Sequence, residues 1–128
     1  MGRPLKILIA DDEDDHITIL GLYLKNIGAD VESARDPEDC LRMFEFHRPE
    51  LVFLDVDLGF PGGFVTAGKI RAKAAEFGQP VRIFMYTARK TADDVERARK
   101  MGADDYIVKP VDRDVLYAKI RKFFPGIV

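Results

Sequence analysis

The chain has 128 residues, of which 47% are hydrophobic and 33% charged, and its formal net charge is −2. This length fits one domain with a sizeable core, and the hydrophobic content excludes an intrinsically disordered chain. Acidic and basic residues are nearly balanced and form no long run of one sign, which argues against direct contact with nucleic acid. We expect one folded domain over residues 1–128, with its core at about residues 5–124.

Cys40 is the only cysteine, so the chain cannot form an internal disulfide. Its apolar neighbours Leu41 and Phe44 predict a buried thiol, and a lone cysteine of this kind is typical of a reducing cytoplasm. The N-terminal region has only one strand-sized apolar run, from Ile7 to Ala10, which is too short for a signal peptide or a membrane span. The sequence therefore favours a cytoplasmic protein without membrane contact.

Short apolar runs alternate with longer segments of helical period along the whole chain. This pattern is typical of an α/β fold, a doubly wound parallel sheet with helices on both faces. Five strands are predicted, in chain order: Lys6–Ala10, Asp30–Ala34, Leu51–Asp55, Val81–Tyr86 and Asp105–Val108.

Apolar stripes and capping residues mark the helices between these strands. Two stripes at helical spacing should face the sheet: Ile17, Leu20, Leu24 and Ile27, and Val115, Leu116, Ile120 and Phe123. Helix starts are indicated by Asp36 directly before Pro37 and by Thr91 with Asp94 three residues later. Gly28 and Gly102 stand where the first and fourth helices should stop.

Polar residues lie at the carboxyl ends of four predicted strands: Asp11, Asp12, Asp55, Thr87, which Ala88 follows, and Lys109. Ligands of an open parallel sheet bind at this edge. Three carboxylates there repel one another unless a cation neutralises them, and oxygen ligands favour Mg²⁺, with Mn²⁺ as the alternative ion. The pattern predicts phosphoryl transfer, with Asp55 as nucleophile and Lys109 paired with a phosphate oxygen. Thr87 and Ala88 would donate a hydroxyl and a backbone N–H to the phosphoryl group.

These residues, in this order on these strand ends, resemble the receiver domain of two-component response regulators. The resemblance spans nearly the whole chain and includes the segments Pro49–Asp55 and Gly102–Pro110. It implies a flavodoxin-like receiver fold, as in chemotaxis regulators, and a function in signal transduction. Such a domain is a phosphoacceptor and not an enzyme, although it phosphorylates itself from a donor with Mg²⁺ and slowly dephosphorylates itself.

The resemblance also implies a role for each site residue. Asp55 would be the phosphoacceptor and, with Asp12, a direct magnesium ligand, while Asp11 would act mainly through water and Asp57 through its backbone carbonyl. Thr87 and Tyr106 would move on phosphorylation and so change the surface. The family usually has a cis peptide bond at the position of Lys109–Pro110 as well.

The partners implied by the resemblance are a histidine kinase or phosphotransfer protein as donor and a downstream protein. The downstream protein would bind the fourth helix, fifth strand and fifth helix. Dimerisation on phosphorylation is a further possibility. The fourth helix, from about Thr91 to Met101, has few large apolar anchors beyond Val95 and Met101, so we expect it to be the mobile part of that surface.

One departure from the family pattern lies beside the acceptor. Gly59 replaces the usual proline four residues after Asp55, whereas Gly63 keeps its expected place. Asp57 and Arg89 occupy positions that overlook the phosphoryl group, and their opposite charges could pair above it. Such a pair would restrict the attacking water and lengthen the life of the phosphate. An unchanged dephosphorylation rate in Arg89→Ala would contradict this.

Other interpretations were weighed. A degenerate receiver would act as an interaction module without phosphorylation, and Asp55-Val56-Asp57 also resembles a haloacid-dehalogenase-like phosphatase, whose magnesium carboxylates follow the nucleophile instead of preceding it. The segment 63–69 has P-loop spacing, but Ile70 stands where a hydroxyl must bind magnesium. His16 and His47 lack a metal-spaced partner, which favours surface or helix-flank positions.

Overall fold

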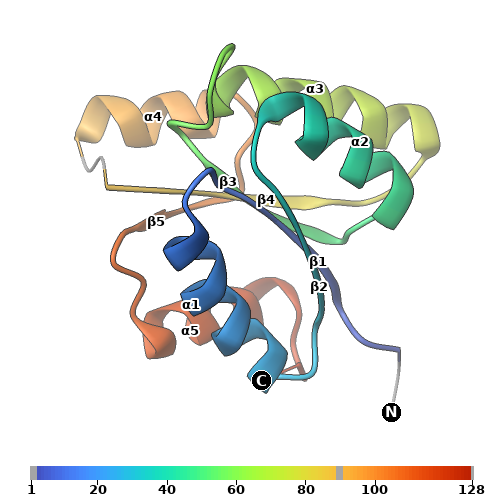
Figure 1. Cartoon of the computed structure of the whole chain (residues 1–128), viewed down its shortest axis with the longest axis vertical. Helices are drawn as coiled ribbons and strands as arrows, with labels where there is room; N and C mark the ends of the chain where they lie inside the picture. Colours follow the sequence, from blue (N-terminus) through green and yellow to red (C-terminus); the bar gives the residue numbers. More distant parts are fainter. Residues whose placement is uncertain (1–2, 89–90, 128) are drawn as a thin grey trace.

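The computed structural model describes residues 3–88 and 91–127, and these form one five-stranded parallel sheet with helices on both faces (Figure 1). The strands are β1 (Lys6–Ala10), β2 (Asp30–Ala34), β3 (Leu51–Asp55), β4 (Arg82–Thr87) and β5 (Asp105–Val108). The helices are α1 (Asp14–Asn26), α2 (Pro37–His47), α3 (Gly63–Phe77), α4 (Ala92–Lys100) and α5 (Arg113–Phe123). The strand order is β2-β1-β3-β4-β5. The predicted α/β fold is confirmed.

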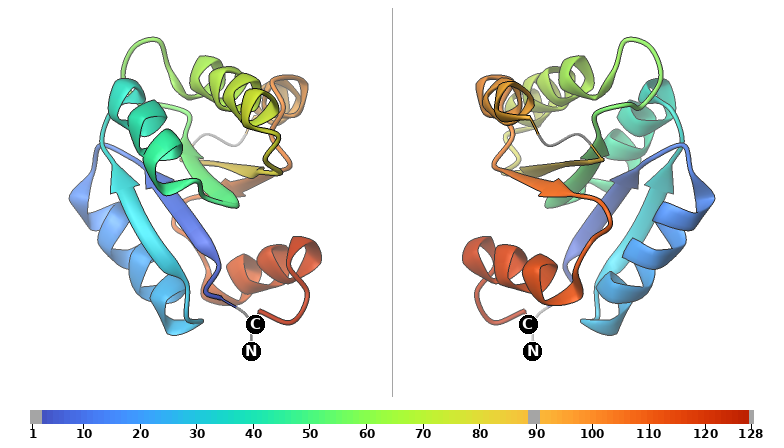
Figure 2. Two further views of the ribbon diagram at one scale, coloured as in Figure 1. Left: turned by 90° about the vertical axis from the view of Figure 1, so that its right-hand side faces the viewer. Right: turned by 90° about the vertical axis from the view of Figure 1, so that its left-hand side faces the viewer.

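Two apolar layers form the core, one on each face of the sheet, and Figure 2 shows the helices that lie over each face. Helices α1 and α5 cover one face, where Leu20 and Leu116 pack against β1, β3 and β4. Helices α2, α3 and α4 cover the other face, where Phe44 and Ile70 are fully buried. All five residues of the central strand β3 are buried, including Asp55 at its end. A rigid buried strand therefore carries the candidate nucleophile.

The predicted strand boundaries are confirmed for four strands, and the fourth is shifted by one residue. The strand was predicted at Val81–Tyr86, but the ladder begins with Arg82 opposite Leu51 and ends with Thr87 opposite Val108. Val81 is buried by packing without joining the ladder, which explains the wrong boundary. Thr87 consequently belongs to the strand.

The two apolar stripes and the predicted helix ends are confirmed except at Val115. The stripe on α1 packs against the sheet, as do Leu116 and Ile120 on α5. Val115, however, is 49% exposed, because one residue turns a helix by about 100° and Leu116 is the residue that points at the sheet. Asp36 and Thr91 cap α2 and α4 through their side chains. Gly28 and Gly102 both have positive φ.

The fourth helix holds to the core mainly through one small side chain. Ala98 is its only buried residue, whereas Val95, expected to be an anchor, is 44% exposed. Met101 is partly buried against the core. Few apolar contacts are typical of an element with low local stability, but the predicted mobility of α4 stays a prediction.

Cys40 is buried in the layer under α2, as predicted. Burial raises the pKa of its thiol to about 12, with smaller contributions from the charges of Asp39 and Asp36. Within residues 3–88 and 91–127, no helix has the length and apolar character needed to cross a membrane.

Candidate phosphoryl-transfer site

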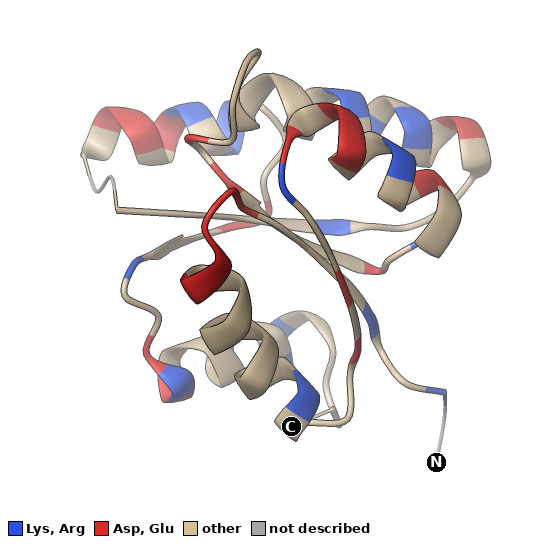
Figure 3. Ribbon diagram, viewed as in Figure 1, with Lys and Arg blue, Asp and Glu red and all other residues tan. Residues whose placement is uncertain are grey.

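The candidate site lies at the carboxyl ends of β1, β3 and β5, where the strand order reverses. Strand β1 has β2 on one side and β3 on the other. At such a switch point the loops that follow neighbouring strands run to opposite faces of the sheet, and ligands bind between them. Asp11 follows β1 and Asp55 ends β3, and acidic residues continue into the start of α1 (Figure 3). The topology thus collects negative charge at one point.

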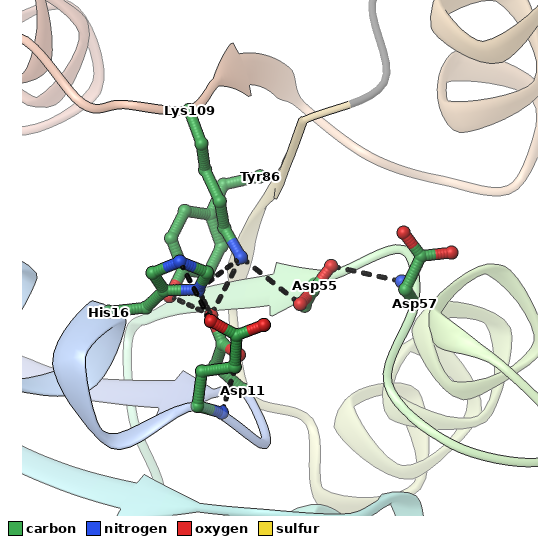
Figure 4. Close-up of polar contacts among 7 residues, drawn as sticks. Asp11, His16, Asp55, Asp57, Tyr86 and Lys109 are labelled. Carbon is green, nitrogen blue, oxygen red and sulfur yellow. Dashed lines mark hydrogen bonds and ion pairs between the residues drawn. The ribbon is translucent and has the colours of Figure 1, made fainter.

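Lys109 joins the two carboxylates. Its Nζ lies 2.8 Å from Asp11 Oδ2 and 3.1 Å from Asp55 Oδ2 (Figure 4). The backbone N–H of Lys109 donates to the carbonyl of Thr87 at 2.8 Å, which ties the segment after β5 to the end of β4. The Lys109–Pro110 bond is cis, as predicted, and Phe60–Pro61 is also cis. The predicted grouping of Asp11, Asp55 and Lys109 is present in the structure.

Asp11 is fully buried and accepts hydrogen bonds from three groups besides its contact with the His16 imidazole. These are Lys109, the Tyr86 hydroxyl at 2.5 Å and the backbone N–H of Glu13 at 3.0 Å. Burial by itself would raise the pKa of Asp11, but the three hydrogen bonds outweigh it and lower the pKa to about 2. Asp11 is therefore a fixed negative charge at neutral pH.

Asp55 is held differently. Its Oδ1 accepts the backbone N–H of Asp57 at 2.9 Å, and its Oδ2 faces Lys109. Burial raises the pKa of Asp55, and the charge of Asp11 adds to this, while Asp57 and Lys109 offset only part of it. The ionised form of Asp55 is thus less stable than that of an exposed aspartate, and a cation bound beside it would favour ionisation.

Tyr86 was predicted only as part of an apolar strand, and the structure places its hydroxyl in the site. Its ring lies beneath Lys109, with Nζ 4.3 Å from the ring centroid. Burial raises the pKa of Tyr86, and its hydrogen bond to Asp11 raises it further. The phenol is therefore a permanent donor to Asp11. An aromatic residue in a buried run is normally core, so the sequence carried little signal of this polar contact.

His16 was predicted to be a surface or helix-flank residue, and it lies partly exposed in the first turn of α1, a helix-flank position, but the sequence did not predict its contact with the site. Its Nδ1 lies 2.9 Å from Asp11 Oδ2 and 2.8 Å from Lys109 Nζ. The first turn of α1 turns the imidazole back over the end of β1 (Figure 4). The other histidine, His47, ends α2 and is buried.

The remaining predicted site residues lie around this cluster. Asp12 is exposed and adjoins Asp11, Thr87 is buried at the end of β4, and Ala88 is exposed beside it. Tyr106 is half-buried on β5, opposite Met85 in the ladder. The positions agree with a site on these strand ends, while the roles of these residues stay predictions.

The backbone of the loop between β3 and α3 differs from what the family's usual proline would allow. Gly59 has a φ of 41°, which a proline cannot adopt, so the glycine in place of the usual proline changes the loop conformation. The neighbouring Phe60 is 97% exposed. Asp57 is exposed in the same loop, but Arg89, its predicted partner, lies outside the described residues.

The donor set fits a divalent cation. One ligand atom each of Asp11, His16 and Asp55 lies within 4.8 Å of the others. Two carboxylates and water suit Mg²⁺, which rarely takes more protein ligands than this. The exposed Asp12 adjoins the group and is free of the core packing that holds Asp11.

Comparison with known proteins identifies the family. The family model of the response regulator receiver domain matches residues 7–121 of the chain. The chain belongs to this family. It is therefore a receiver domain of the kind found in two-component signal transduction, as its sequence predicted.

Known receivers resemble the chain in sequence and in structure. A probable transcriptional regulator, ycf27, of Porphyridium aerugineum is 39% identical over 91% of this chain and 46% of its own length. The alkaline phosphatase synthesis transcriptional regulatory protein PhoP of Bacillus subtilis is 34% identical over 91% of this chain and 47% of its own. The chain thus spans about half the length of these curated relatives.

The solved structures support the same fold. A two-component response regulator from Clostridium difficile superposes with a TM-score of 0.86 at 26% identity, over 95% of this chain and 97% of that one. A CheY-like receiver domain protein from Methanospirillum hungatei superposes with a TM-score of 0.85 over 97% and 96% of the two chains; at 24% identity this likeness concerns the fold alone.

Proposed function

We propose that this receiver domain accepts a phosphoryl group on Asp55 in a reaction that depends on a divalent cation, most simply Mg²⁺. The observation that carries the proposal is the position of Lys109, whose ammonium lies within 3.1 Å of both Asp11 and Asp55. A fixed cation beside the nucleophile is the arrangement that phosphoryl transfer requires, because charge develops on the phosphoryl oxygens.

Each side chain of the site has its own role in the transfer. An oxygen of Asp55 attacks phosphorus, the bond to the donor breaks, and the donor leaves with its electron pair. Lys109, already paired with Asp55, pairs with a phosphoryl oxygen. Thr87 and the backbone N–H of Ala88 donate to the other oxygens. The product is an aspartyl phosphate at the end of β3, a strand whose five residues are all buried.

The cation would be held by Asp12 and Asp55, with Asp11 acting mainly through water and the backbone carbonyl of Asp57 as a further ligand. When bound, it supplies positive charge that offsets the carboxylates and the incoming phosphoryl oxygens. Asp11 stays ionised beneath it because Lys109 and Tyr86 hold its charge. The raised pKa of Asp55 is a physical reason why phosphorylation would depend on the cation.

The donor would be a histidine kinase or a phosphotransfer protein, and the output a change of surface. Thr87 and Tyr106 lie on neighbouring strands, with Thr87 beside the site and Tyr106 half-buried toward α4. Movement of Thr87 toward the phosphoryl group would let Tyr106 turn inward. A downstream protein would then bind α4, β5 and α5, and dimerisation of the phosphorylated form is a second outcome. A cytoplasmic location fits these partners.

The test is phosphorylation by acetyl phosphate with Mg²⁺, followed by intact mass measurement. Wild type and Asp112→Asn, which alters only the cap of α5, should each gain the mass of one phosphoryl group, whereas Asp55→Asn should gain none. Chelation of the cation should abolish the gain. An unmodified wild type would favour a degenerate receiver that acts only as an interaction module. Steady turnover of phosphate without an adduct would favour a phosphatase.

The P-loop interpretation has no support in the structure. The segment with that spacing is helical from Gly63 onward, and Phe64 is buried against the core. These residues form the start of α3 and not a loop around a phosphate, and the N–H of Gly63 donates to the carbonyl of Val56.

A further inference from the structure

We propose that Tyr86 is a positioning residue for phosphoryl transfer. Its hydroxyl holds the charge of Asp11, so that Lys109 can leave Asp11 and pair with the incoming phosphoryl group. The inference deepens the proposed function and rests on it, because it concerns one step of the same transfer. It comes from one contact of this chain, the hydrogen bond between the Tyr86 hydroxyl and Asp11 (Figure 4).

The two oxygens of Asp11 have different partners. Oδ1 accepts the backbone N–H of Glu13 at 3.0 Å. Oδ2 accepts the Tyr86 hydroxyl at 2.5 Å and the Lys109 ammonium at 2.8 Å. Because Asp11 is fully buried, water cannot easily replace a donor that leaves Oδ2. A buried carboxylate that loses its partner is costly, so the release of Lys109 depends on what remains at that oxygen.

The Tyr86 hydroxyl is the donor that remains. Tyr86 lies on β4 directly opposite Asp55 in the ladder, and its ring is buried edge-on against Phe53 with the centroids 6.3 Å apart. The strand and this packing fix the hydroxyl independently of Lys109. It also donates to Asp11 whichever nitrogen of the His16 imidazole carries a proton. The hydrogen bond therefore persists when the lysine moves.

Lys109 has to change partners during the transfer. In the resting site its Nζ lies between Asp11 and Asp55 and above the ring of Tyr86, 4.3 Å from the centroid. When Asp55 bonds to phosphorus, the ammonium turns to a phosphoryl oxygen and its share in the charge of Asp11 falls. The bonds made and broken are those of the transfer to Asp55, and Tyr86 keeps its proton throughout.

The contact of Tyr86 should therefore be stronger in the transition state than in the resting site. At rest, two donors share the charge of Asp11 Oδ2, whereas during the transfer the hydroxyl carries more of it. Only an interaction that strengthens in this way raises the rate of the chemical step. Without the hydroxyl, Asp11 would hold Lys109 more tightly and slow its movement to the phosphoryl group.

The experiment follows the acetyl phosphate reaction by intact mass over time, with saturating Mg²⁺, in wild type, Tyr86→Phe and Tyr117→Phe. Tyr86→Phe keeps the ring and loses only the hydroxyl, and it should react at least about tenfold more slowly. Tyr117→Phe is the matched control, because its hydroxyl donates to the Tyr23 carbonyl at 2.7 Å, outside the site. This variant should react within about twofold of wild type, and urea denaturation would check that both variants are folded.

A double-mutant cycle separates positioning from a purely structural effect. The neutral amide of Asp11→Asn has no charge to hold, so adding Tyr86→Phe in this background should change the rate by less than about twofold. Equal rates in wild type and Tyr86→Phe, or the same slowing in both backgrounds, would overturn the inference and leave the proposed function standing. A wild type that forms no adduct would instead sink the proposed function and the inference with it.

Discussion

Replacing Gly63 with alanine is expected to lower the free energy of unfolding by about 3 kcal/mol. A Cβ on Gly63 would lie 2.1 Å from the carbonyl oxygen of Asp55 and 2.8 Å from the Cα of Val56. Both are backbone atoms, so no side chain can turn away to make room. The start of α3 would have to separate from the end of β3, where its N–H now donates to Val56 at 3.0 Å.

The same change should impair the site. Asp55 is the residue whose backbone the new methyl group strikes, so its carboxylate would move relative to Lys109, which is now 3.1 Å away. Denaturation in urea measures the stability, and the acetyl phosphate reaction measures the site. We expect Gly63→Ala to be both less stable and slower to gain a phosphoryl group.

Gly68→Ala is the matched control. Gly68 lies in the same helix, and a Cβ there meets nothing within 4 Å. Alanine in a helix interior is more favourable than glycine by about 0.5–1 kcal/mol, so this variant should be slightly stabilised. Equal urea midpoints for the two variants would show that the contact between Gly63 and Asp55 does not constrain the fold.

The sequence predicted the elements that rest on local rules. The buried run ending in Asp55 and the caps at Asp36 and Thr91 depend on neighbouring residues alone, and the structure has them as expected. The grouping of Asp11 and Lys109 followed from topology, because the carboxyl ends of parallel strands meet at one edge. These contacts join residues far apart in the chain, yet strand order was enough to predict them.

Side-chain direction within an element was harder to predict. Tyr86 ends an apolar run and fills core space, but its hydroxyl reaches Asp11. His16 is five residues after Asp11, a spacing with no known ligand meaning, and only the turn between β1 and α1 brings it back over the site. The prediction that Val115 faces the sheet was wrong for a similar reason, because hydrophobicity does not show which of two adjacent residues points inward.

Replacing Lys109 with methionine should lower the free energy of unfolding by about 3 kcal/mol at neutral pH without a divalent cation. The new side chain fills most of the space but carries no charge. Asp11, which is fully buried, would keep hydrogen bonds from Tyr86 and Glu13 but lose its ammonium partner. Removing one partner of a buried pair leaves the other charge uncompensated, which is why the loss is large.

Lys73→Met is the control for loss of a lysine charge. Lys73 pairs with Glu45 on the surface between α3 and α2, where both side chains are partly exposed. Such a pair contributes little to stability, because water and salt screen it. Urea denaturation of the two variants should separate the buried pair from the exposed one, and similar losses would contradict the central role of Lys109.

Acid should reduce the difference between wild type and Lys109→Met. Asp11 has a folded-state pKa of about 2, below its ordinary value of 3.8, so its contribution to stability is present above about pH 4 and is lost as the pH falls toward 2. Without Lys109 the folded-state pKa rises, and the variant has less of this contribution to lose. The two stability curves should therefore converge below about pH 4.

A divalent cation should reduce the difference as well. In Lys109→Met the two carboxylates lack their ammonium, so added Mg²⁺ would supply the missing positive charge and raise the melting temperature more than it does in wild type, where it competes with Lys109. Equal shifts in both proteins would mean that Lys109 and the cation occupy separate parts of the site. A larger shift in the variant would show that they share the same pair of carboxylates, as the distances from Lys109 to Asp11 and Asp55 imply.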